Sequence, residues 1–174
     1  MRFEDFWYVV ARSEELRAGA PLGRKVLGEW VAVFRDAGGE PRALRDRCMH
    51  RASRLSLGKV DGGCLRCPYH GWTYDGAGEV VDVPAEGANY KRLSSRRTPA
   101  YPTLERDGYV YVRLAETPTE EVEPFAMPFF GRPGWEHLRV VNRFRNNVTN
   151  CAANFIDITH TVPVQPGIFR SDRR

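Results

Sequence analysis

The sequence predicts a mainly β protein in which residues 1–116 form an antiparallel β-sandwich or barrel. Short runs rich in aromatic and β-branched residues recur along this part of the chain, and glycine-containing turns separate them. Strong helical patterns are almost absent before residue 149. Many short strands joined by tight turns are typical of sandwiches and barrels.

The strands before the first histidine are predicted in chain order. Residues 6–11 form an aromatic and β-branched run, and Ser13 then caps a short helical turn. Residues 26–27 and 30–34 are strand-like, with Gly28-Glu29 between them as a tight turn.

Later strands are bounded by stronger turn signals. Residues 75–78, Asp-Gly-Ala-Gly, predict a hairpin whose return strand spans residues 80–83 and ends before Pro84. Asp107-Gly108 predicts another turn, followed by alternation of apolar and polar or aromatic residues from 109 to 114.

Composition shifts divide the chain into three parts. Residues 1–116 form the first predicted domain, and the acidic, proline-bearing residues 117–134 are predicted to be a linker. Residues 135–174 form a short α+β segment. In it we expect a strand over residues 138–148 and a helix over residues 149–160, with Thr149 or Asn150 as its N-cap.

Composition also narrows the class of protein. The 174 residues are 42% hydrophobic with a net charge of +4, as in globular proteins. No apolar run approaches the roughly 20 residues of a membrane helix, and no basic-aromatic motif of a nucleic-acid module is present. We therefore expect neither a membrane nor a nucleic-acid partner. The start of the sequence has no signal-peptide profile, which predicts a cytoplasmic location.

Two short segments concentrate metal-ligating residues. Cys48-Met49-His50 is followed by sixteen residues and then by Cys67-Pro68-Tyr69-His70-Gly71-Trp72. A tetrahedral zinc site also accepts two Cys and two His, but zinc fingers usually place a Cys pair on one arm and a His pair on the other. Arms that each carry one Cys and one His favour a two-iron cluster, in which Cys₂ binds one iron and His₂ the other.

These segments resemble the Rieske [2Fe–2S] motif, C-x-H-x₁₆-C-x₂-H, in the form found in bacterial Rieske non-haem iron oxygenases. The resemblance implies a Rieske-type fold with two cluster-binding loops and a [2Fe–2S] cofactor. It implies that Cys48 and Cys67 bind the inner iron, and that His50 and His70 bind the outer iron, with His70 as the electron exit.

The resemblance also bears on the reduction potential. Rieske proteins of respiratory complexes carry a disulfide between the loops, which Ser53 and Tyr69 cannot form, and a serine at the position of Trp72. With fewer hydrogen bonds to sulfur, we expect a potential near the low end of the Rieske range, about −150 mV. Trp72 either screens the cluster from water or simply packs in the core.

A second resemblance lies in the tail. Asn154, Asp157 and His160 recur every three residues, as on one helix face, and resemble the N-x-x-D-x-x-H of Rieske oxygenase catalytic domains. By that resemblance His160 is a ligand of a mononuclear Fe(II), and Asp157 links it to the Rieske histidine of a neighbouring subunit. Gln165 replaces the family's second histidine, so a facial triad of two His and one carboxylate is incomplete here.

Two functional hypotheses therefore stand. The first is an electron-transfer protein related to ring-hydroxylating and demethylating oxygenases, with mononuclear iron only in an intact homologue. The second is a fragment of a complete terminal oxygenase. The resemblance implies a ferredoxin or flavin reductase as electron donor and a trimeric assembly. Six arginines lie in or just before the motif region and form either a solvated rim or a docking face for an acidic donor: Arg42, Arg45, Arg47, Arg51, Arg54 and Arg66.

Overall fold

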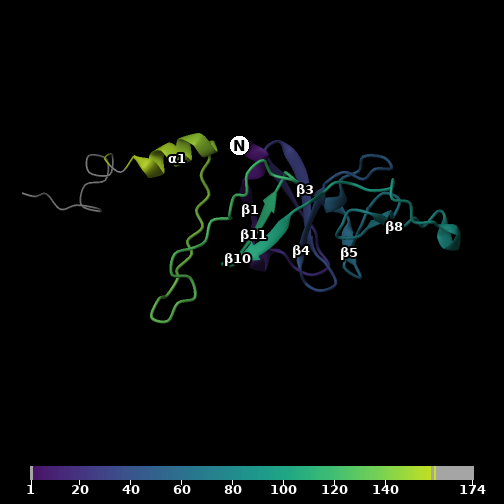
Figure 1. Cartoon of the computed structure of the whole chain (residues 1–174), viewed down its shortest axis with the longest axis horizontal. Helices are drawn as coiled ribbons and strands as arrows, with labels where there is room; N and C mark the ends of the chain where they lie inside the picture. Colours follow the sequence, from purple (N-terminus) through teal and green to yellow (C-terminus); the bar gives the residue numbers. More distant parts are fainter. Residues whose placement is uncertain (1, 158, 160–174) are drawn as a thin grey trace, which may run out of the picture. The chain divides into compact units, whose positions relative to one another are not determined.

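A computed structural model describes residues 2–157 and 159, and within them the strands form three antiparallel sheets (Figure 1). The first sheet has the order β1–β11–β10, the second β2–β3–β4–β9 and the third β5–β6–β7–β8. The strands are β1 Trp7–Arg12, β2 Leu22–Val26, β3 Glu29–Arg35, β4 Pro41–Arg45, β5 Lys59–Asp61, β6 Cys64–Arg66, β7 Thr73–Tyr74, β8 Val80–Asp82, β9 Ala100–Tyr101, β10 Thr103–Arg106 and β11 Tyr109–Arg113. The predicted mainly β, antiparallel fold is confirmed.

The second sheet contributes to two separate hydrophobic cores. In β3, Val31 and Val33 are buried in the core shared with β1 and β11, whereas Ala32 and Phe34 are buried in the core shared with β6, β7 and β8. Successive strand residues point to opposite faces, so a strand that is apolar throughout can serve both cores. This sheet therefore lies between the other two, as in a layered sandwich.

The predicted turn at Gly28-Glu29 is wrong by one residue. Val26 pairs with Glu29, so the two-residue turn is Leu27–Gly28, and both residues have positive φ, 49° and 90°. A turn of this kind requires positive φ at both central positions, and leucine rarely occupies such a position. Propensity alone therefore placed Leu27 in the strand. The predicted turns at residues 75–78 and at Asp107-Gly108 are confirmed.

Contacts within the chain divide it into two units, residues 1–130 and 131–174. In the described part of the second unit, residues 138–147 are not a strand, contrary to prediction. The helix α1 spans Val148–Ile156, and the side chain of Asn147, rather than Thr149 or Asn150, caps it by accepting a hydrogen bond from Asn150 N at 2.8 Å. No helix among the described residues is long and apolar enough to span a membrane.

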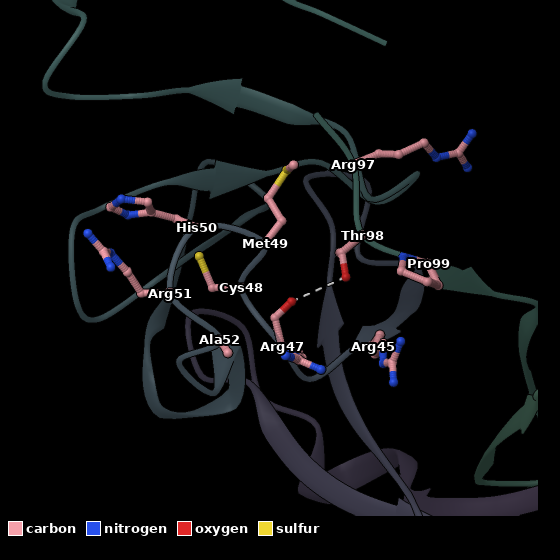
Figure 2. Close-up of a pocket in the computed structure, with 10 residues that line it drawn as sticks. All are labelled: Arg45, Arg47, Cys48, Met49, His50, Arg51, Ala52, Arg97, Thr98 and Pro99. Atoms are coloured by element: carbon pink, nitrogen blue, oxygen red, sulfur yellow. Dashed lines mark hydrogen bonds between the residues drawn. The ribbon is translucent and has the colours of Figure 1, made fainter. Parts of the chain in front are cut away.

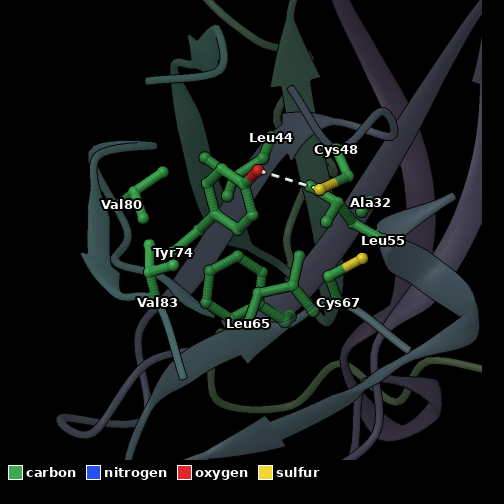
Figure 3. Close-up of a cluster of buried hydrophobic side chains, with 10 residues drawn as sticks. Ala32, Leu44, Cys48, Leu55, Leu65, Cys67, Tyr74, Val80 and Val83 are labelled. Carbon is green, nitrogen blue, oxygen red and sulfur yellow. Dashed lines mark hydrogen bonds between the residues drawn. The ribbon is translucent and has the colours of Figure 1, made fainter. Parts of the chain in front are cut away.

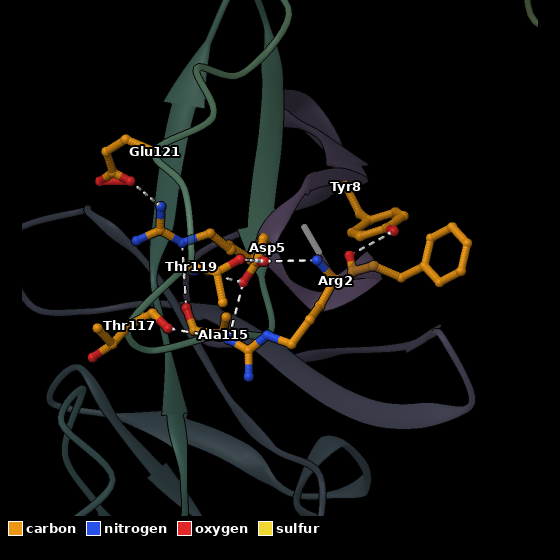
Figure 4. A network of polar contacts seen from close by, with 9 residues as sticks. Arg2, Asp5, Tyr8, Ala115, Thr117, Thr119 and Glu121 are labelled. Carbon is orange, nitrogen blue, oxygen red and sulfur yellow. Dashed lines mark hydrogen bonds and ion pairs between the residues drawn. The ribbon is translucent and has the colours of Figure 1, made fainter.

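Residues 117–127, predicted as part of a linker, are hydrogen-bonded to the first sheet and the segment before it. Trp7 Nε1 donates to the Val122 carbonyl at 2.9 Å, and Arg113 pairs with Glu121 at 2.9 Å. The fully buried carboxylate of Asp5 accepts hydrogen bonds from Arg2 and from both the backbone and hydroxyl of Thr119 (Figure 4). Asp5 thus holds the N-terminus and this segment together.

Those hydrogen bonds predict a pH-dependent stability. They favour the charged carboxylate, the Thr119 hydroxyl most of all, so the pKa of Asp5 lies well below its usual range. A lowered folded-state pKa stabilises the protein above the unfolded-state pKa of about 3.9, and this contribution is lost as pH falls toward the folded-state pKa. Asp5→Asn should therefore lower the urea midpoint at pH 7, and by somewhat less near pH 3, where the unfolded-state carboxyl is already mostly protonated and part of the contribution is lost.

The exposed Asp61 provides the control. Its carboxylate lies 3.8 Å from Lys59 in a solvated pair, so Asp61→Asn should change the midpoint little at either pH. An equal loss for Asp5→Asn at both pH values would show that the charge of Asp5 is not what stabilises this corner.

Candidate metal centre

The first ligand loop follows β4 and is closed by its own backbone. Cys48 N donates to the Ser53 carbonyl at 2.8 Å, and Ala52 N donates to the Cys48 carbonyl at 2.8 Å. Ala52 has a φ of 57°, the left-handed conformation that lets the chain reverse within these few residues. Cys48, Met49 and His50 are thereby presented on a compact turn.

An ion pair between the buried Asp46 carboxylate and the partly exposed Arg54, which we call the Asp46–Arg54 clasp, joins the residues on either side of this loop. The Asp46 side chain is fully buried and accepts from Arg54 Nε at 2.9 Å, Ser56 N at 2.7 Å and Ser56 Oγ at 2.6 Å. The Arg54 guanidinium also stacks on Trp30, 3.7 Å from the ring centroid. Because every contact here is made by the protein itself, the base of the loop is held without any metal.

The second ligand loop connects β6 and β7. Cys67 N donates to the Trp72 carbonyl at 2.8 Å, and Gly71 N donates to the Cys67 carbonyl at 3.2 Å. Gly71 has a φ of 74°, and a Cβ there would lie 3.0 Å from the Pro84 ring. A larger residue at position 71 would be strained in conformation and crowded by Pro84.

The two thiols are buried while the two imidazoles are exposed. Cys48 and Cys67 are each only 3% exposed within the core between the second and third sheets, and Figure 3 shows their sulfur atoms on the same side of it. His50 and His70 are exposed, with ring centroids 4.7 Å apart. The four side chains therefore form an inner sulfur pair and an outer nitrogen pair.

Their protonation equilibria reflect this placement. Burial raises the pKa of the Cys67 thiol, and the adjacent Cys48 thiol raises it further, whereas the N–H groups of Tyr69 and His70 oppose the shift. Desolvation lowers the pKa of His50, with smaller contributions from His70 and Arg51. A lowered histidine pKa favours the neutral imidazole, which is the form that binds metals.

This arrangement fits a two-metal centre better than a single zinc ion. A tetrahedral zinc site would need all four ligands around one point. A centre with two irons needs only two ligands at each iron, one sulfur pair and one nitrogen pair. All four cysteines are free, and Cys64 lies half-buried in β6, outside the sulfur pair.

Tyr74 belongs to this site although no sequence motif predicted it. The Tyr74 hydroxyl lies 3.1 Å from Cys48 Sγ and accepts from Met49 N at 3.1 Å, and its side chain is completely buried (Figure 3). Once Cys48 is a thiolate, only the hydroxyl can donate between these two atoms. The expectation of few hydrogen bonds to sulfur therefore did not include the one from Tyr74. The only sequence feature that could have indicated this residue is its position two residues after Trp72, next to the second motif segment.

Trp72 contacts both the outer histidine pair and the core; its screening of a cluster from water stays a prediction. Its ring stacks on that of His50 with centroids 4.9 Å apart and an angle of 6° between the planes. It also packs, half-buried, against the core that contains the thiols. Trp72 thus covers part of the outer histidine pair and extends the core at the same time.

The predicted tail residues belong to the second unit, residues 131–174. Asn154 lies in α1, but the helix ends at Ile156, so Asp157 follows it as the C-cap instead of continuing a helical face. His160 and Gln165 lie outside the described residues. Their predicted roles at a mononuclear iron stay predictions.

Comparison with known proteins gives one consistent family. A family model described as the Rieske [2Fe–2S] domain matches residues 6–102. The chain is 28% identical over 176 residues to the iron-sulfur subunit TsaM1 of a toluene-4-sulfonate monooxygenase system from Comamonas testosteroni, covering 99% of this chain and 49% of TsaM1. It is 33% identical over 171 residues to the methylxanthine N1-demethylase NdmA of Pseudomonas putida, covering 93% of this chain and 47% of NdmA.

Solved structures agree with these matches. A crystal structure of dicamba monooxygenase bound to dicamba matches with a TM-score of 0.64 and 38% identity, over 75% of this chain and 37% of that one. Another dicamba monooxygenase structure contains non-heme iron together with dicamba. The chain thus spans about half the length of TsaM1 and NdmA, and a smaller share of dicamba monooxygenase.

The Tyr74 hydroxyl predicts an effect on reduction potential. Tyr74→Phe removes the donor to Cys48 Sγ and leaves more electron density on the sulfur, so a metal centre bound through Cys48 should become harder to reduce. We expect a fall on the order of 60 mV, equivalent to about tenfold in a one-electron equilibrium. A redox titration followed by electron paramagnetic resonance measures it.

Tyr90→Phe is the matched control. Tyr90 packs against the same core, but its hydroxyl donates to the Val80 carbonyl rather than to sulfur. Its loss should lower stability and leave the potential unchanged. If both variants have the wild-type potential, the Tyr74 hydroxyl does not act on the metal centre.

Proposed function

Because the chain belongs to the Rieske [2Fe–2S] domain family, we propose that it carries single electrons toward a mononuclear non-haem iron site in an oxygenase or demethylase system. The observation that carries this proposal is the division of the four ligands into a buried sulfur pair and an exposed nitrogen pair. A cluster held this way has one iron insulated by the core and the other close to solvent and to partners.

We assign Cys48 and Cys67 to the inner iron and His50 and His70 to the outer iron. When bound, a [2Fe–2S] cluster accepts and releases one electron. The chain's own residues set the conditions for this: the core excludes water from the thiolates, and Tyr74 donates to the Cys48 sulfur. The exposed imidazole edges offer the shortest routes into and out of the site.

Partners and assembly are proposed on the family resemblance. Relatives are named as the iron-sulfur subunit of a monooxygenase system and as the oxygenase component of dicamba O-demethylase. By analogy, a ferredoxin or flavin reductase donates electrons to this cytoplasmic protein. The protein assembles as a trimer, and the electron leaves through His70 toward Asp157 of a neighbouring subunit.

A second candidate is that the chain is part of a complete terminal oxygenase. The supporting observation is coverage: TsaM1 matches 99% of this chain, yet this chain covers only 49% of TsaM1. In that case His160 would bind a mononuclear Fe(II), and the part of the oxygenase outside this sequence would supply the remaining iron ligands, including the carboxylate. The substrate would be set by residues outside this sequence.

Metal analysis with paired cysteine variants tests the cluster. Purified protein should contain two irons and two acid-labile sulfides per chain, and Cys67→Ser should lose them because the inner iron loses a thiolate ligand. Cys64→Ser is the matched control: a half-buried cysteine three residues away, outside the sulfur pair, whose loss should leave the iron content unchanged. Colourless protein with one zinc per chain would refute the cluster.

The same analysis tests whether this chain holds a mononuclear iron by itself. After Fe(II) is added to cluster-loaded protein, the electron-transfer proposal gives two irons per chain. A tightly bound third iron that disappears in His160→Ala would instead show that this chain itself holds a mononuclear site.

A further inference from the structure

The six arginines near the motif fall into two groups in the structure. Three are neutralised within the protein: Arg42 pairs with Asp36 at 2.7 Å, Arg54 belongs to the Asp46–Arg54 clasp and Arg45 lies 3.5 Å from Glu29. The other three, with Arg97, make no ion pair with a described residue: Arg47, Arg51 and Arg66. Charge that the fold does not neutralise is available to a partner.

Three of these unpaired cations surround one pocket beside the first ligand loop. The pocket has a volume of about 350 Å³, and no acidic residue lines it; its walls include Arg47, Arg51, Arg97, Met49 and His50. Thr98 Oγ1 donates to the Arg47 carbonyl at 3.3 Å, which joins the segment bearing Arg97 to this loop (Figure 2). We call this surface the arginine face.

The arginine face is shaped for a protein rather than for a small anion. Figure 2 shows the guanidinium groups of Arg51 and Arg97 on opposite sides of Met49, so they do not converge on one point. Met49 is 42% exposed at the centre, and Arg51 lies beside His50. An apolar centre with a charged rim is typical of protein interfaces.

We propose that the arginine face is where an acidic one-electron donor protein docks, so that electrons enter through His50 and leave through His70. This inference rests on the proposed function and names the donor's chemistry and its contact surface. The pocket beside the second loop, lined by Arg66 and Lys59, is a poorer candidate because Lys59 is already paired with Asp61. In the transfer, the reduced donor loses one electron and the centre bound by the four ligands gains it.

A plant-type [2Fe–2S] ferredoxin with a net negative charge is a suitable probe. Its potential of about −400 mV lies below the Rieske range, so the transfer is downhill. Stopped-flow absorption should show that Arg51→Glu/Arg97→Glu lowers the second-order rate of reduction at least about tenfold at low salt, because steering by charge is lost. The difference in reduction rate between wild type and the double variant should disappear as the ionic strength rises from about 0.01 M to 1 M, because the Debye length falls from about 30 Å to 3 Å.

Two control variants and a binding measurement make the test specific. Arg66→Glu, beside the second loop, is compared with the single variant Arg97→Glu because the two change the net charge equally. Arg97→Glu should lower the rate of reduction clearly more than Arg66→Glu does. Arg17→Glu alters an exposed arginine that lines neither pocket and should match wild type. Calorimetry with oxidised ferredoxin should show weaker binding for Arg97→Glu and recovery in Arg97→Lys, without any electron transfer.

The outcomes also distinguish this inference from the proposed function. Absence of iron and sulfide, or of bleaching by dithionite, would refute the proposed function itself. Normal loading and normal dithionite bleaching, with ferredoxin rates and binding equal in wild type and Arg97→Glu, would refute the arginine face alone. Arg97 lies outside both ligand loops, so this single variant decides the matter even if Arg51→Glu fails to load its cluster.

Discussion

The site depends on one constraint: two thiols must lie in an apolar core while two imidazoles, only two or three residues further along the chain, must reach water. A regular strand would send residues two apart to the same face, so a strand cannot supply both Cys48 and His50. Each Cys–His pair instead lies on a tight loop in which the cysteine is buried in the core and the histidine is exposed to solvent. The left-handed conformations of Ala52 and Gly71 allow these reversals.

The middle sheet provides the platform for those loops. Because β3 and β4 are apolar on both faces, they bury one core against β1 and β11 and another against the strands that carry the second loop. The core that encloses the thiols is therefore not a separate small domain with a marginal interior. It shares its central strands with the rest of the first unit.

The sequence predicted the family and two of the turns better than the contacts around them. The mixed Cys–His spacing and the Asp-Gly pairs are local signals: the first predicted the Rieske family and the second predicted turns, and both predictions are confirmed. Tyr74 and the Asp46–Arg54 clasp escaped prediction because each depends on contacts between residues brought together only by folding. The turn at Leu27 and the absence of a strand over residues 138–147 were missed for a related reason. Residue alternation and strand propensity predict a strand poorly where tertiary packing determines the backbone conformation, or where no neighbouring strand is present to pair with it.

The Asp46–Arg54 clasp has a consequence for how such a protein acquires and loses its cofactor. Many small metal-binding domains are unfolded until the metal arrives, so metal binding must supply the free energy of folding. Here the first loop is closed at its base by an ion pair, two serine contacts and backbone hydrogen bonds, none of which involves a ligand atom at the metal. The chain entropy of closing that loop is lost during folding rather than during assembly of the cluster. We therefore expect iron and sulfide to be delivered to an acceptor that is already shaped, and oxidative loss of the cluster to leave a folded protein that can be reloaded rather than degraded.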